Sequence, residues 1–470
     1  MRGMTNWVLM LGLISITLLA IGQQPAVYQR LPVISDDGSD VLFQTVPIGT
    51  GGLPTLDVFQ MSPNMMRTAG MGVYLRTLAG LPSLIAQDSA RPHFSISQGM
   101  HIVYMRGGNG TPMQVYLYDR QQNREILISG LGTDPVNRQP GANHSVCPRV
   151  NKNGRIIAFA SLDPGLHDPN GNGIPDPLPI YATPTVDAPW IIYVHDRDVD
   201  GNGTYDEISP DPTVVTVATY AVAVTSFPYV ALSPDTGGTY IAYQVYNATN
   251  RVWGLFVKDW RNNLVTDPPV AVSPVKFSVP SVVGITQPVI GALVAFTANV
   301  AFNGNRAGVW LAEIDFSGAA PAVNRFVPVS LNNGVNGAPV ISPDTAFIAF
   351  HTTASDIVIP DTNLVDRNGV DDIYVFDLTT LQPVWSTLFV RNIPNSPPPP
   401  IGLFDPCVHP SLSSVVGNNL FVAFEHWWKD PATGQQQILV RKVGIDLTTF
   451  ASNLLFAWKT GRARRYVPLR

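Results

Sequence analysis

The feature of this sequence that most constrains its fold is a short proline-led module that recurs along the chain. In residues 147–161 the module begins at Pro148, and Asn153-Gly154 supplies a two-residue turn that tolerates positive φ. An apolar run at 156–159 follows the turn, and a second β-favouring run lies at 191–194. The segment therefore predicts a strand, a tight turn, a strand, a connection and a further strand.

The module occurs seven times, in repeat units that start near residues 30, 90, 146, 226, 286, 337 and 404. The prolines that open these units are Pro32, Pro92, Pro148, Pro228, Pro288, Pro339 and Pro406. In five units the predicted third strand carries an aromatic residue with an acid three positions later, namely Tyr116 and Asp119, Tyr193 and Asp196, Phe256 and Asp259, Trp310 and Glu313, and Tyr374 and Asp377. Since one four-stranded sheet cannot bury both of its faces alone, units of this size predict blades that close into a ring.

The module resembles the repeat of TolB-like, WD-type β-propellers, in which a proline and a Ser-Pro-Asp-Gly turn precede an Ala-Phe strand. Ser233-Pro234-Asp235 and Ser342-Pro343-Asp344 match this hallmark most closely, and residues 35–38 match it nearly. The resemblance covers roughly residues 25–465. It implies an all-β, seven-bladed propeller of four-stranded antiparallel blades, with six blades as the alternative if unit 1 or unit 5 is irregular. Because propellers serve as binders, lyases and hydrolase accessory domains, the resemblance specifies the fold more than the function.

The N-terminal segment predicts export. Arg2 precedes an uncharged apolar stretch at 7–21, and Ala20-Ile21-Gly22 places small residues where a signal peptidase cleaves. We expect a signal peptide at residues 1–22 and a single propeller domain at 23–470, located in the periplasm or outside the cell. An uncleaved anchor is the alternative, but about 15 apolar residues fall short of the roughly 20 that a spanning helix needs. We expect no stable membrane span once the leader is removed.

Composition argues against nucleic acid as a partner. The net charge is −5, the pI is about 5.9 and charged residues make up only 13% of the chain, so no basic surface is expected. The two cysteines, Cys147 and Cys407, fall in units 3 and 7, which a seven-unit ring separates. A disulfide requires Cα atoms within about 7 Å, so we predict two buried free thiols.

The sequence favours binding over catalysis. No Gly-x-Ser-x-Gly elbow occurs, and none of the eight histidines pair at metal-ligand spacing. A TolB-like lyase that acts on oligogalacturonate holds histidines around a channel metal, and this resemblance implies His93, His144 and His409 as candidates. We assign no catalytic residue and expect a non-catalytic propeller that binds a protein or a cell-envelope or extracellular ligand through its loops or channel face. The alternatives are a polysaccharide lyase or glycosidase, and a structural surface component.

Three acidic segments are candidate calcium loops, because oxygen ligands at alternate positions around a glycine turn converge on one point. They resemble the aspartate-rich loops of EF-hand and thrombospondin type 3 repeats, although Pro179 and Ser209 stand where an EF-hand has its last glutamate. A tight surface turn without metal is the alternative, since turns use the same residue types. The candidate ligands are Asp168, Asn170, Asn172 and Asp176; Asp198, Asp200, Asn202 and Asp206; and, as a weaker set, Asp366, Asn368 and Asp372.

If calcium is a structural ion in these loops, its removal lowers the melting temperature. We expect a lower Tm in excess chelator than in millimolar calcium, because a ligand that binds only the folded state stabilises it. The affinity expected for an extracellular loop is weak, with a Kd of about 10⁻⁴ to 10⁻³ M. Equal melting temperatures in chelator and in calcium would count against a bound ion.

Overall fold

The structure of the chain is a computed structural model. It describes residues 27–47, 71–77, 83–87, 89–94, 100–108, 111–132, 134, 137–166, 190–207, 214–220, 229–247, 252–262, 269–273, 280–286, 289–298, 300–318, 320–359, 364–390, 401–402, 404–429, 434–448, 451–459 and 462–463. The predicted signal peptide and the candidate calcium loop at 168–176 lie outside the described residues.

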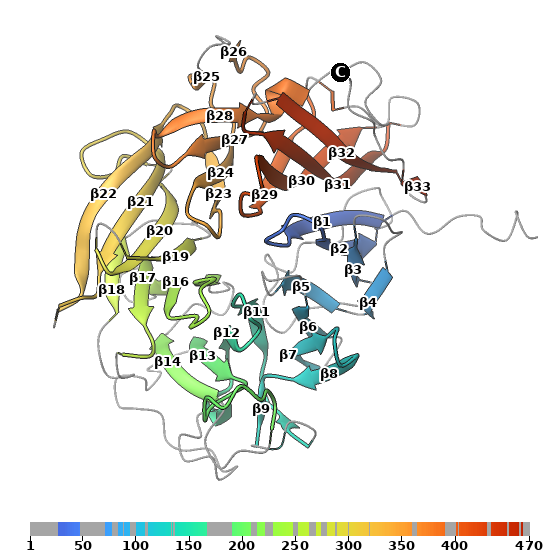
Figure 1. The fold of residues 1–470 in the computed structure, drawn as a ribbon, viewed down its shortest axis with the longest axis vertical. Coiled ribbons are helices and arrows are strands. Elements are labelled where there is room, and N and C mark those ends of the chain that lie inside the picture. Colours follow the sequence, from blue (N-terminus) through green and yellow to red (C-terminus); the bar gives the residue numbers. More distant parts are fainter. Residues whose placement is uncertain are drawn as a thin grey trace, which may run out of the picture.

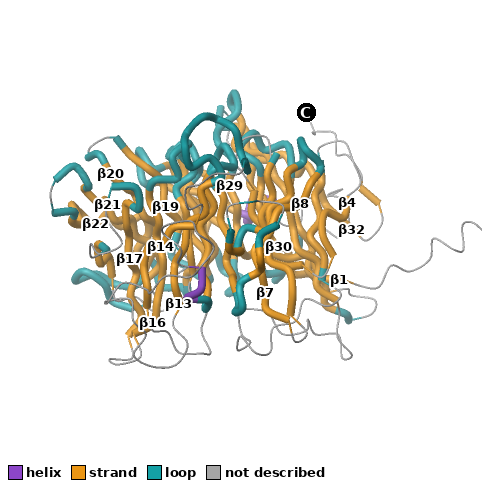
Figure 2. Tube along the Cα trace, turned by 90° about the horizontal axis from the view of Figure 1, so that it is seen from below, coloured by secondary structure: helices purple, strands orange, loops and turns teal. Residues whose placement is uncertain are grey.

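The described residues form seven antiparallel sheets that follow one another in sequence around a ring, so the fold is an all-β, seven-bladed propeller (Figure 1). Strands run roughly along the axis of the ring, and loops gather at its two ends (Figure 2). In each blade the first strand is the innermost. Because neighbouring strands are antiparallel, the first-to-second and third-to-fourth connections lie at one end of the ring, here called the turn end. The second-to-third connections and the links between blades lie at the other, here called the crossover end.

The first three blades account for residues up to 220. Blade 1 comprises β1 (Val27–Ile34), β2 (Val41–Pro47), β3 (Gly72–Arg76) and β4 (Ser83–Gln87). Blade 2 comprises β5 (Ser89–Phe94), β6 (His101–Gly108), β7 (Thr111–Asp119) and β8 (Arg124–Leu127). Blade 3 comprises β11 (Ser145–Val150), β12 (Ile156–Ser161), β13 (Trp190–Asp196) and β14 (Val214–Tyr220).

The other four blades complete the ring. Blade 4 comprises β15 (Tyr229–Leu232), β16 (Tyr240–Asn247), β17 (Val252–Asp259) and β18 (Val270–Ser273). Blade 5 comprises β19 (Ser281–Ile285), β20 (Gly291–Ala298), β21 (Gly308–Asp315) and β22 (Ala322–Leu331). Blade 6 comprises β23 (Asn336–Ile341), β24 (Phe347–Thr352), β27 (Asp372–Asp377) and β28 (Gln382–Ser386). Blade 7 comprises β29 (Cys407–Leu412), β30 (Asn419–Lys429), β31 (Gln436–Asp446), β32 (Ala451–Lys459) and β33 (Arg462–Ala463).

The expectation of four strands in every blade is met only in part. Blade 7 carries a fifth strand, and two small two-stranded sheets stand beside the blades. These are β9 (Gly130–Leu131) with β10 (Gln139–Pro140), and β25 (Val358–Ile359) with β26 (Leu364–Val365). Helix is limited to the short 3₁₀ segments η3 (Pro164–Leu166) and η5 (Thr387–Val390) among the described residues. No described helix has the length and apolarity needed to cross a membrane.

A side-chain oxygen stabilises the recurring turn between the first and second strands. It accepts the backbone N–H of a residue at the start of the second strand. The Oγ of Ser342 accepts the N–H of Phe347 at 2.9 Å and donates to the carboxylate of Asp344. Blade 3 uses the amide oxygen of Asn151 in the same way, accepting the N–H of Ile156 at 2.9 Å. Equivalent contacts at Ser35, Ser233 and Ser413 explain why the Ser-Pro-Asp pattern recurs.

The aromatic residues of the repeat pair across neighbouring strands in the interior of the blades. Phe159 on β12 lies opposite Tyr193 on β13, with ring centroids 5.7 Å apart, and both side chains are fully buried. The other stacked cross-strand pairs are Phe43 with Tyr74, Tyr104 with Tyr116, Tyr243 with Phe256, and Phe350 with Tyr374. These pairs add packing specificity to the apolar burial that holds each blade against its neighbours.

The acid that follows the third-strand aromatic residue caps the next turn. The carboxylate of Asp119 accepts the N–H groups of Gln121 and Gln122, and Asp377 accepts those of Thr379 and Thr380. In blade 5 the capping carboxylate belongs to Asp315 and not to Glu313, which is the acid of the repeat pattern. Glu313 instead accepts hydrogen bonds from Arg325 on β22.

Three of the predicted opening prolines do not stand where the repeat implies. Pro228 precedes β15, which pairs with β16 without a bulge. The first strand of blade 5, β19, lies upstream of Pro288, which falls outside the described residues. In blade 7 the bulge of the first strand lies between Val408 and Ser411, so Pro410 rather than Pro406 occupies the position held by Pro32 and Pro148. The residue before the proline has positive φ in each of these bulges, as at Leu31 and His409, because the bulge turns the backbone there.

The ring closes where blade 1 packs against blade 7. Among the described residues no strand of either blade pairs with a strand of the other, so closure depends on side chains and single hydrogen bonds. The N–H of Val440 donates to the Oε1 of Gln29 at 3.0 Å, and the N–H of Ser414 donates to the carbonyl of Asp36 at 3.0 Å. An apolar cluster that includes Phe43 and Val440 fills the interface.

Candidate functional site

Titratable side chains from three blades meet towards the crossover end of the ring. We call Arg30, His351, Asp371, His409 and Glu425 the histidine–carboxylate cluster. Arg30 and His409 come from the innermost strands of blades 1 and 7, Glu425 lies on β30, His351 lies near the end of β24, and Asp371 directly precedes β27. The cluster therefore exists only because the closed ring brings blades 6, 7 and 1 together.

Glu425 is the centre of the cluster and is fully buried. Its Oε1 accepts the N–H of Leu31 at 2.8 Å, and its Oε2 accepts the indole N–H of Trp427 at 3.0 Å. The guanidinium of Arg30 lies 3.4 Å from the same carboxylate and also stacks over the Trp427 ring, with Cζ 5.5 Å from its centroid. A buried carboxylate with this many donors is held in one orientation.

Two histidines lie side by side, and each contacts a different carboxylate. The Nδ1 of His409 is 3.1 Å from the Oε1 of Glu425, and the Nδ1 of His351 is 3.1 Å from the Oδ1 of Asp371. The two imidazole centroids are 5.6 Å apart. The His409 side chain remains 34% exposed, so its ring can present Nε2 to a group outside the cluster.

The electrostatics of the cluster oppose protonation of its buried members. Burial alone would raise the pKa of Glu425, but His409, Arg30 and the Leu31 N–H outweigh it and lower that pKa to about 2. Burial lowers the pKa of His351, and repulsion from His409 adds to this, while Asp371 acts in the opposite direction. Glu425 is therefore ionised throughout the physiological range.

A second row of buried polar groups supports the cluster from within blade 7. The Nε2 of His426 is 2.9 Å from the Oδ2 of Asp405, and the Nε of Arg441 donates to the Nδ1 of His426 at 3.1 Å. Cys407 is buried beside them as a thiol, and its N–H donates to the carbonyl of Asp371 at 2.8 Å. Cys147 is also buried, and neither cysteine forms a disulfide, so the prediction of two buried thiols is confirmed.

The three histidines singled out from the sequence do not come together. The Nδ1 of His93 accepts the N–H of Val150 at 3.3 Å, and the Nδ1 of His144 accepts the N–H of Met113 at 2.9 Å. Only His409 belongs to the cluster. Within the part of the chain that the structure describes, no group of three His, Cys, Asp or Glu side chains is arranged to hold a metal ion.

Ion pairs with arginines and hydrogen bonds from its own backbone hold the candidate calcium loop at 198–206 in place. Asp206 pairs with the buried guanidinium of Arg197 and with Arg124, which is 3.1 Å away. Asp198 accepts the N–H of Gly203 at 3.3 Å. In the exposed part of the loop the Nδ2 of Asn202 donates to Asp200 at 2.8 Å. The calcium interpretation of this loop stays a prediction.

The weaker candidate loop adopts a similar internally bonded turn. The Oδ1 of Asp366 accepts the N–H of Asn368 at 2.8 Å, and the Nδ2 of Asn368 donates to the Oδ2 of Asp372 at 2.9 Å. Asp366 and Asp372 are buried, and the hydroxyl of Thr387 donates to Asp372. Here too calcium remains a prediction.

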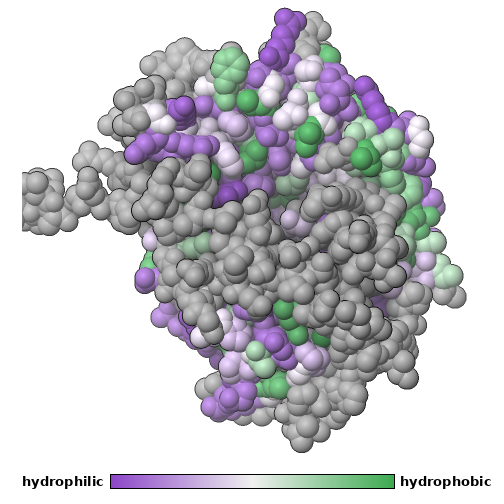
Figure 3. All heavy atoms as spheres, turned by 180° about the vertical axis from the view of Figure 1, so that it is seen from behind, coloured by the Kyte–Doolittle hydropathy of each residue, from purple (hydrophilic) through white to green (hydrophobic). Residues whose placement is uncertain are grey.

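A second feature of the crossover end is a set of exposed apolar side chains on blades 5 to 7. We call Val300, Val335, Val358 and Phe404 the apolar loop surface, and they are 68%, 65%, 49% and 67% exposed. Three of them lie on connections of this end, and Val358 lies in the short β25–β26 sheet inserted between β24 and β27. Figure 3 shows small hydrophobic groups of this kind among hydrophilic residues on one face of the ring.

Hydrogen bonds and an ion pair join the loops that carry Val300, Val335 and Val358. The N–H of Asn333 donates to the carboxylate of Asp356 at 3.0 Å, and Arg306 pairs with the same carboxylate at 3.1 Å. The N–H of Val335 donates to the Oγ1 of Thr353 at 3.0 Å. These contacts connect blade 5 to the second-to-third connection of blade 6 and hold the apolar side chains on a fixed base.

Comparison with known proteins bears on the fold alone. No model of a protein family matches this chain, and no curated protein matches it. The β-propeller domain of the Trilobed protease from Pyrococcus furiosus is 9% identical with a TM-score of 0.46, and the match covers 88% of this chain and 93% of that one. The acylaminoacyl peptidase of Pyrococcus horikoshii is 9% identical with a TM-score of 0.46, over 94% of this chain and 52% of that one.

TolB from Acinetobacter baumannii is also similar, at 16% identity and a TM-score of 0.32, over 60% of this chain and 51% of that one. The chain thus spans about half the length of TolB and of the acylaminoacyl peptidase. Propeller structures and a TolB structure are therefore among its similar folds, as the sequence resemblance predicted. At these TM-scores the similarities carry no argument about function, and the fold is established by the order of the strands.

The cluster predicts how stability depends on pH. The pKa of Glu425 is about 2 in the folded protein and 4.5 in the unfolded chain, so its contribution is complete above pH 4.5 and is lost as the pH falls towards 2. Between pH 5 and pH 3 this one group accounts for a loss of roughly 2 kcal/mol in the free energy of unfolding. We expect Glu425→Gln, measured by urea unfolding, to be less stable than the wild type at pH 7 and to lose less stability over that interval.

His351 contributes in the same direction, because its lowered pKa makes protonation below pH 6.5 unfavourable to the folded state. Because Glu425 is among the groups that raise the pKa of His351, the two proteins are compared in a His351→Gln background, in which this contribution is absent. An equal loss of stability with and without Glu425→Gln would contradict the assigned role of Glu425.

Proposed function

We propose that this protein is an exported, non-catalytic propeller that binds another protein through the apolar loop surface. The observation that supports the proposal is the exposure of Val300, Val335, Val358 and Phe404 at one end of the ring. Solitary exposed apolar residues are common, but four on the connections at one end of blades 5 to 7 favour an interaction surface. Export is proposed from the uncharged apolar stretch at 7–21.

The chemistry of the surface favours a protein over a polysaccharide partner. Three of its four apolar side chains are valines, which bury aliphatic area and offer no flat ring for stacking on a sugar. The polar groups beside them, Arg306, Asp356 and Asn333, hydrogen-bond one another. An apolar centre with a polar rim of satisfied groups is the usual composition of a protein interface.

The lyase or glycosidase alternative receives less support from the arrangement of the histidines. That alternative relied on His93, His144 and His409 converging on the channel, whereas each is bound to a different neighbour. The His409–Glu425 pair fixes one imidazole within blade 7, and the Leu31 N–H on the same carboxylate links blade 7 to blade 1. We therefore assign the cluster a supporting role beneath the binding surface.

The proposal is tested by capture of partners from an envelope extract, with identification by mass spectrometry. We compare the wild type with the double variant Val335→Asp/Phe404→Asp, which places a charge at two of the four positions of the surface. Loss of two apolar anchors and burial of unpaired charge predict at least about a tenfold fall in capture of any specific partner.

Ile290→Asp is the matched control. Ile290 is 60% exposed, comparable to Val335 and Phe404, but it lies on the connection between β19 and β20 at the turn end. We expect this control to capture the same partners as the wild type. The proposal fails if the double variant captures them equally well, or if the control loses them to the same degree.

A further inference from the structure

Two imidazole nitrogens of the histidine–carboxylate cluster are accessible to a ligand. His351 and His409 each contact a carboxylate through Nδ1, at 3.1 Å in both cases. Within the described residues no hydrogen bond or ion pair reaches the Nε2 of either ring. The two side chains are 17% and 34% exposed. The cluster therefore presents two nitrogen atoms that the described part of the protein does not bond.

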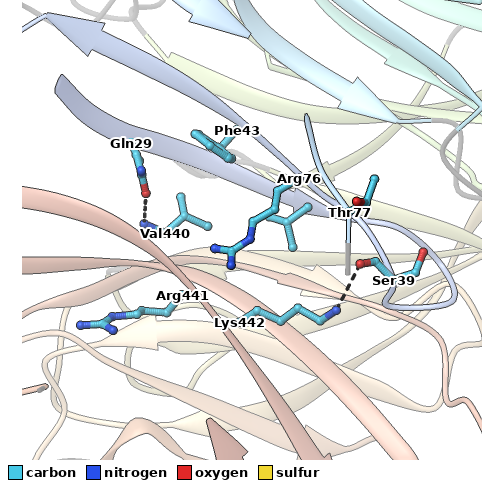
Figure 4. Close-up of a pocket in the computed structure, with 9 residues that line it drawn as sticks. Gln29, Ser39, Phe43, Arg76, Thr77, Val440, Arg441 and Lys442 are labelled. Carbon is cyan, nitrogen blue, oxygen red and sulfur yellow. Dashed lines mark hydrogen bonds between the residues drawn. The ribbon is translucent and has the colours of Figure 1, made fainter. Parts of the chain in front are cut away.

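The polar groups at the turn end of the interface between blades 1 and 7 are, in contrast, engaged within the protein (Figure 4). The ammonium of Lys442 donates to the carbonyls of Gly38 and Ser39. Asp37 and Asp40 attract the same ammonium. The crevice beside Lys442 has a volume of about 10 Å³, room for a single water molecule. The accessible imidazoles are therefore the stronger candidates for a ligand.

A glycine gives the Nε2 of His351 its space. Gly337 on β23 lies directly opposite His351 in the register of β23 and β24. A Cβ atom on Gly337 would stand 2.3 Å from this Nε2, far inside the contact distance of the two atoms. Gly337 does not have a positive φ, so its backbone would accept a side chain. The missing side chain at this position therefore serves the access to His351 rather than a backbone conformation.

The two carboxylates set the tautomer and the orientation of the rings. Asp371 contacts the Nδ1 of His351, and Glu425 contacts the Nδ1 of His409. An imidazole whose Nδ1–H donates to a carboxylate carries its lone pair on Nε2, and histidines that bind metals are usually oriented in this way. Burial, with repulsion from His409, lowers the pKa of His351, against the attraction of Asp371. The ring of His351 is therefore neutral at pH 7 and can bind a cation.

The distance between the two rings suits one shared metal ion. Their centroids are 5.6 Å apart. Two imidazoles bound through Nε2 to one tetrahedral zinc ion have centroids roughly 5 Å apart, given a Zn–N distance of about 2.0 Å. His351 lies on β24 of blade 6 and His409 lies on β29 of blade 7. An ion held by both therefore joins two adjacent blades.

We propose that His351 and His409 bind a divalent transition-metal ion of the zinc class through their Nε2 atoms, with water completing the coordination. Imidazole nitrogen suits Zn²⁺, whereas Ca²⁺ prefers oxygen ligands. The carboxylates of Asp371 and Glu425 offset the charge of the ion, against the guanidinium of Arg30. Because the protein supplies only two ligands, we expect weaker binding than at a four-ligand structural zinc site. The site does not depend on the proposed function of the apolar loop surface.

Isothermal titration calorimetry of the full-length, chelator-treated protein with zinc chloride at pH 7 tests the site. We expect the wild type to bind one ion per chain, and His351→Gln and His409→Gln to bind it at least about tenfold more weakly. His93→Gln is the matched control, because His93 is a partly exposed histidine on the innermost strand of blade 2. Absence of zinc binding in the wild type overturns the proposal, as does wild-type affinity in either variant or an equal loss in the control.

Gly337→Ala tests the geometry while it keeps both ligands. The new Cβ meets the Nε2 of His351, so we expect zinc to bind at least about tenfold more weakly although both histidines are present. Gly318→Ala is the control, because a Cβ there meets nothing within 4 Å, and it keeps the wild-type affinity. Unchanged zinc affinity in Gly337→Ala overturns the assignment of His351 as a ligand and with it the proposal.

Nitrogen-15 NMR of the histidine side chains provides a measurement on the wild-type protein that does not depend on the folding of a variant. We expect zinc to shift the Nε2 signals of His351 and His409, because these atoms bind the ion, and calcium to leave both signals unchanged. Zinc-dependent shifts only at the other six of the eight histidines, or at none, overturn the proposal. Shifts of the two Nε2 signals by calcium contradict an imidazole site selective for transition metals.

Discussion

The constraint on which the whole structure depends is that each blade is apolar on both of its faces. Every residue of β12 and β13 is buried, so blade 3 has no face that could be exposed to water without a large loss of free energy. A sheet of this composition is stable only between two others, and a row of such sheets has two unprotected ends unless it closes. The ring is therefore the only arrangement in which all seven sheets are covered.

The ring closes at a single interface, between blade 1 and blade 7. No described strand of either blade pairs with a strand of the other. Polar groups are concentrated there. Glu425 holds Arg30 and the Leu31 N–H near one end of the ring, and Lys442 reaches the Gly38 carbonyl towards the other. Charged groups buried at an interface confer specificity of register more than net stability. The two polar clusters thus fix how blade 1 meets blade 7, and the apolar cluster between them supplies the cohesion.

The sequence predicted what depends on local chemistry. The turn at Asn153-Gly154 and the Ser-Pro-Asp turns each need only neighbouring strands, and the propeller followed from their repetition. The histidine–carboxylate cluster could not be predicted, since Arg30, His351 and Glu425 lie on three different blades and Arg30 reaches Glu425 only when the ring closes. One signal was present: Glu425 and His426 interrupt an otherwise apolar strand. The proline spacing misplaced the start of blade 5 because the bulge that selects proline is replaced there by a regular strand.

The most direct test of ring closure is a disulfide engineered across the interface between blades 1 and 7. The N–H of Ser414 donates to the carbonyl of Asp36, which places the two residues within the range that a disulfide can span. Asp36→Cys/Ser414→Cys should therefore form an intramolecular bond on oxidation, detected by mass spectrometry of the monomer, while buried Cys147 and Cys407 stay reduced. Free thiols at both new positions, or cross-links only between molecules, would contradict a ring closed by these two blades.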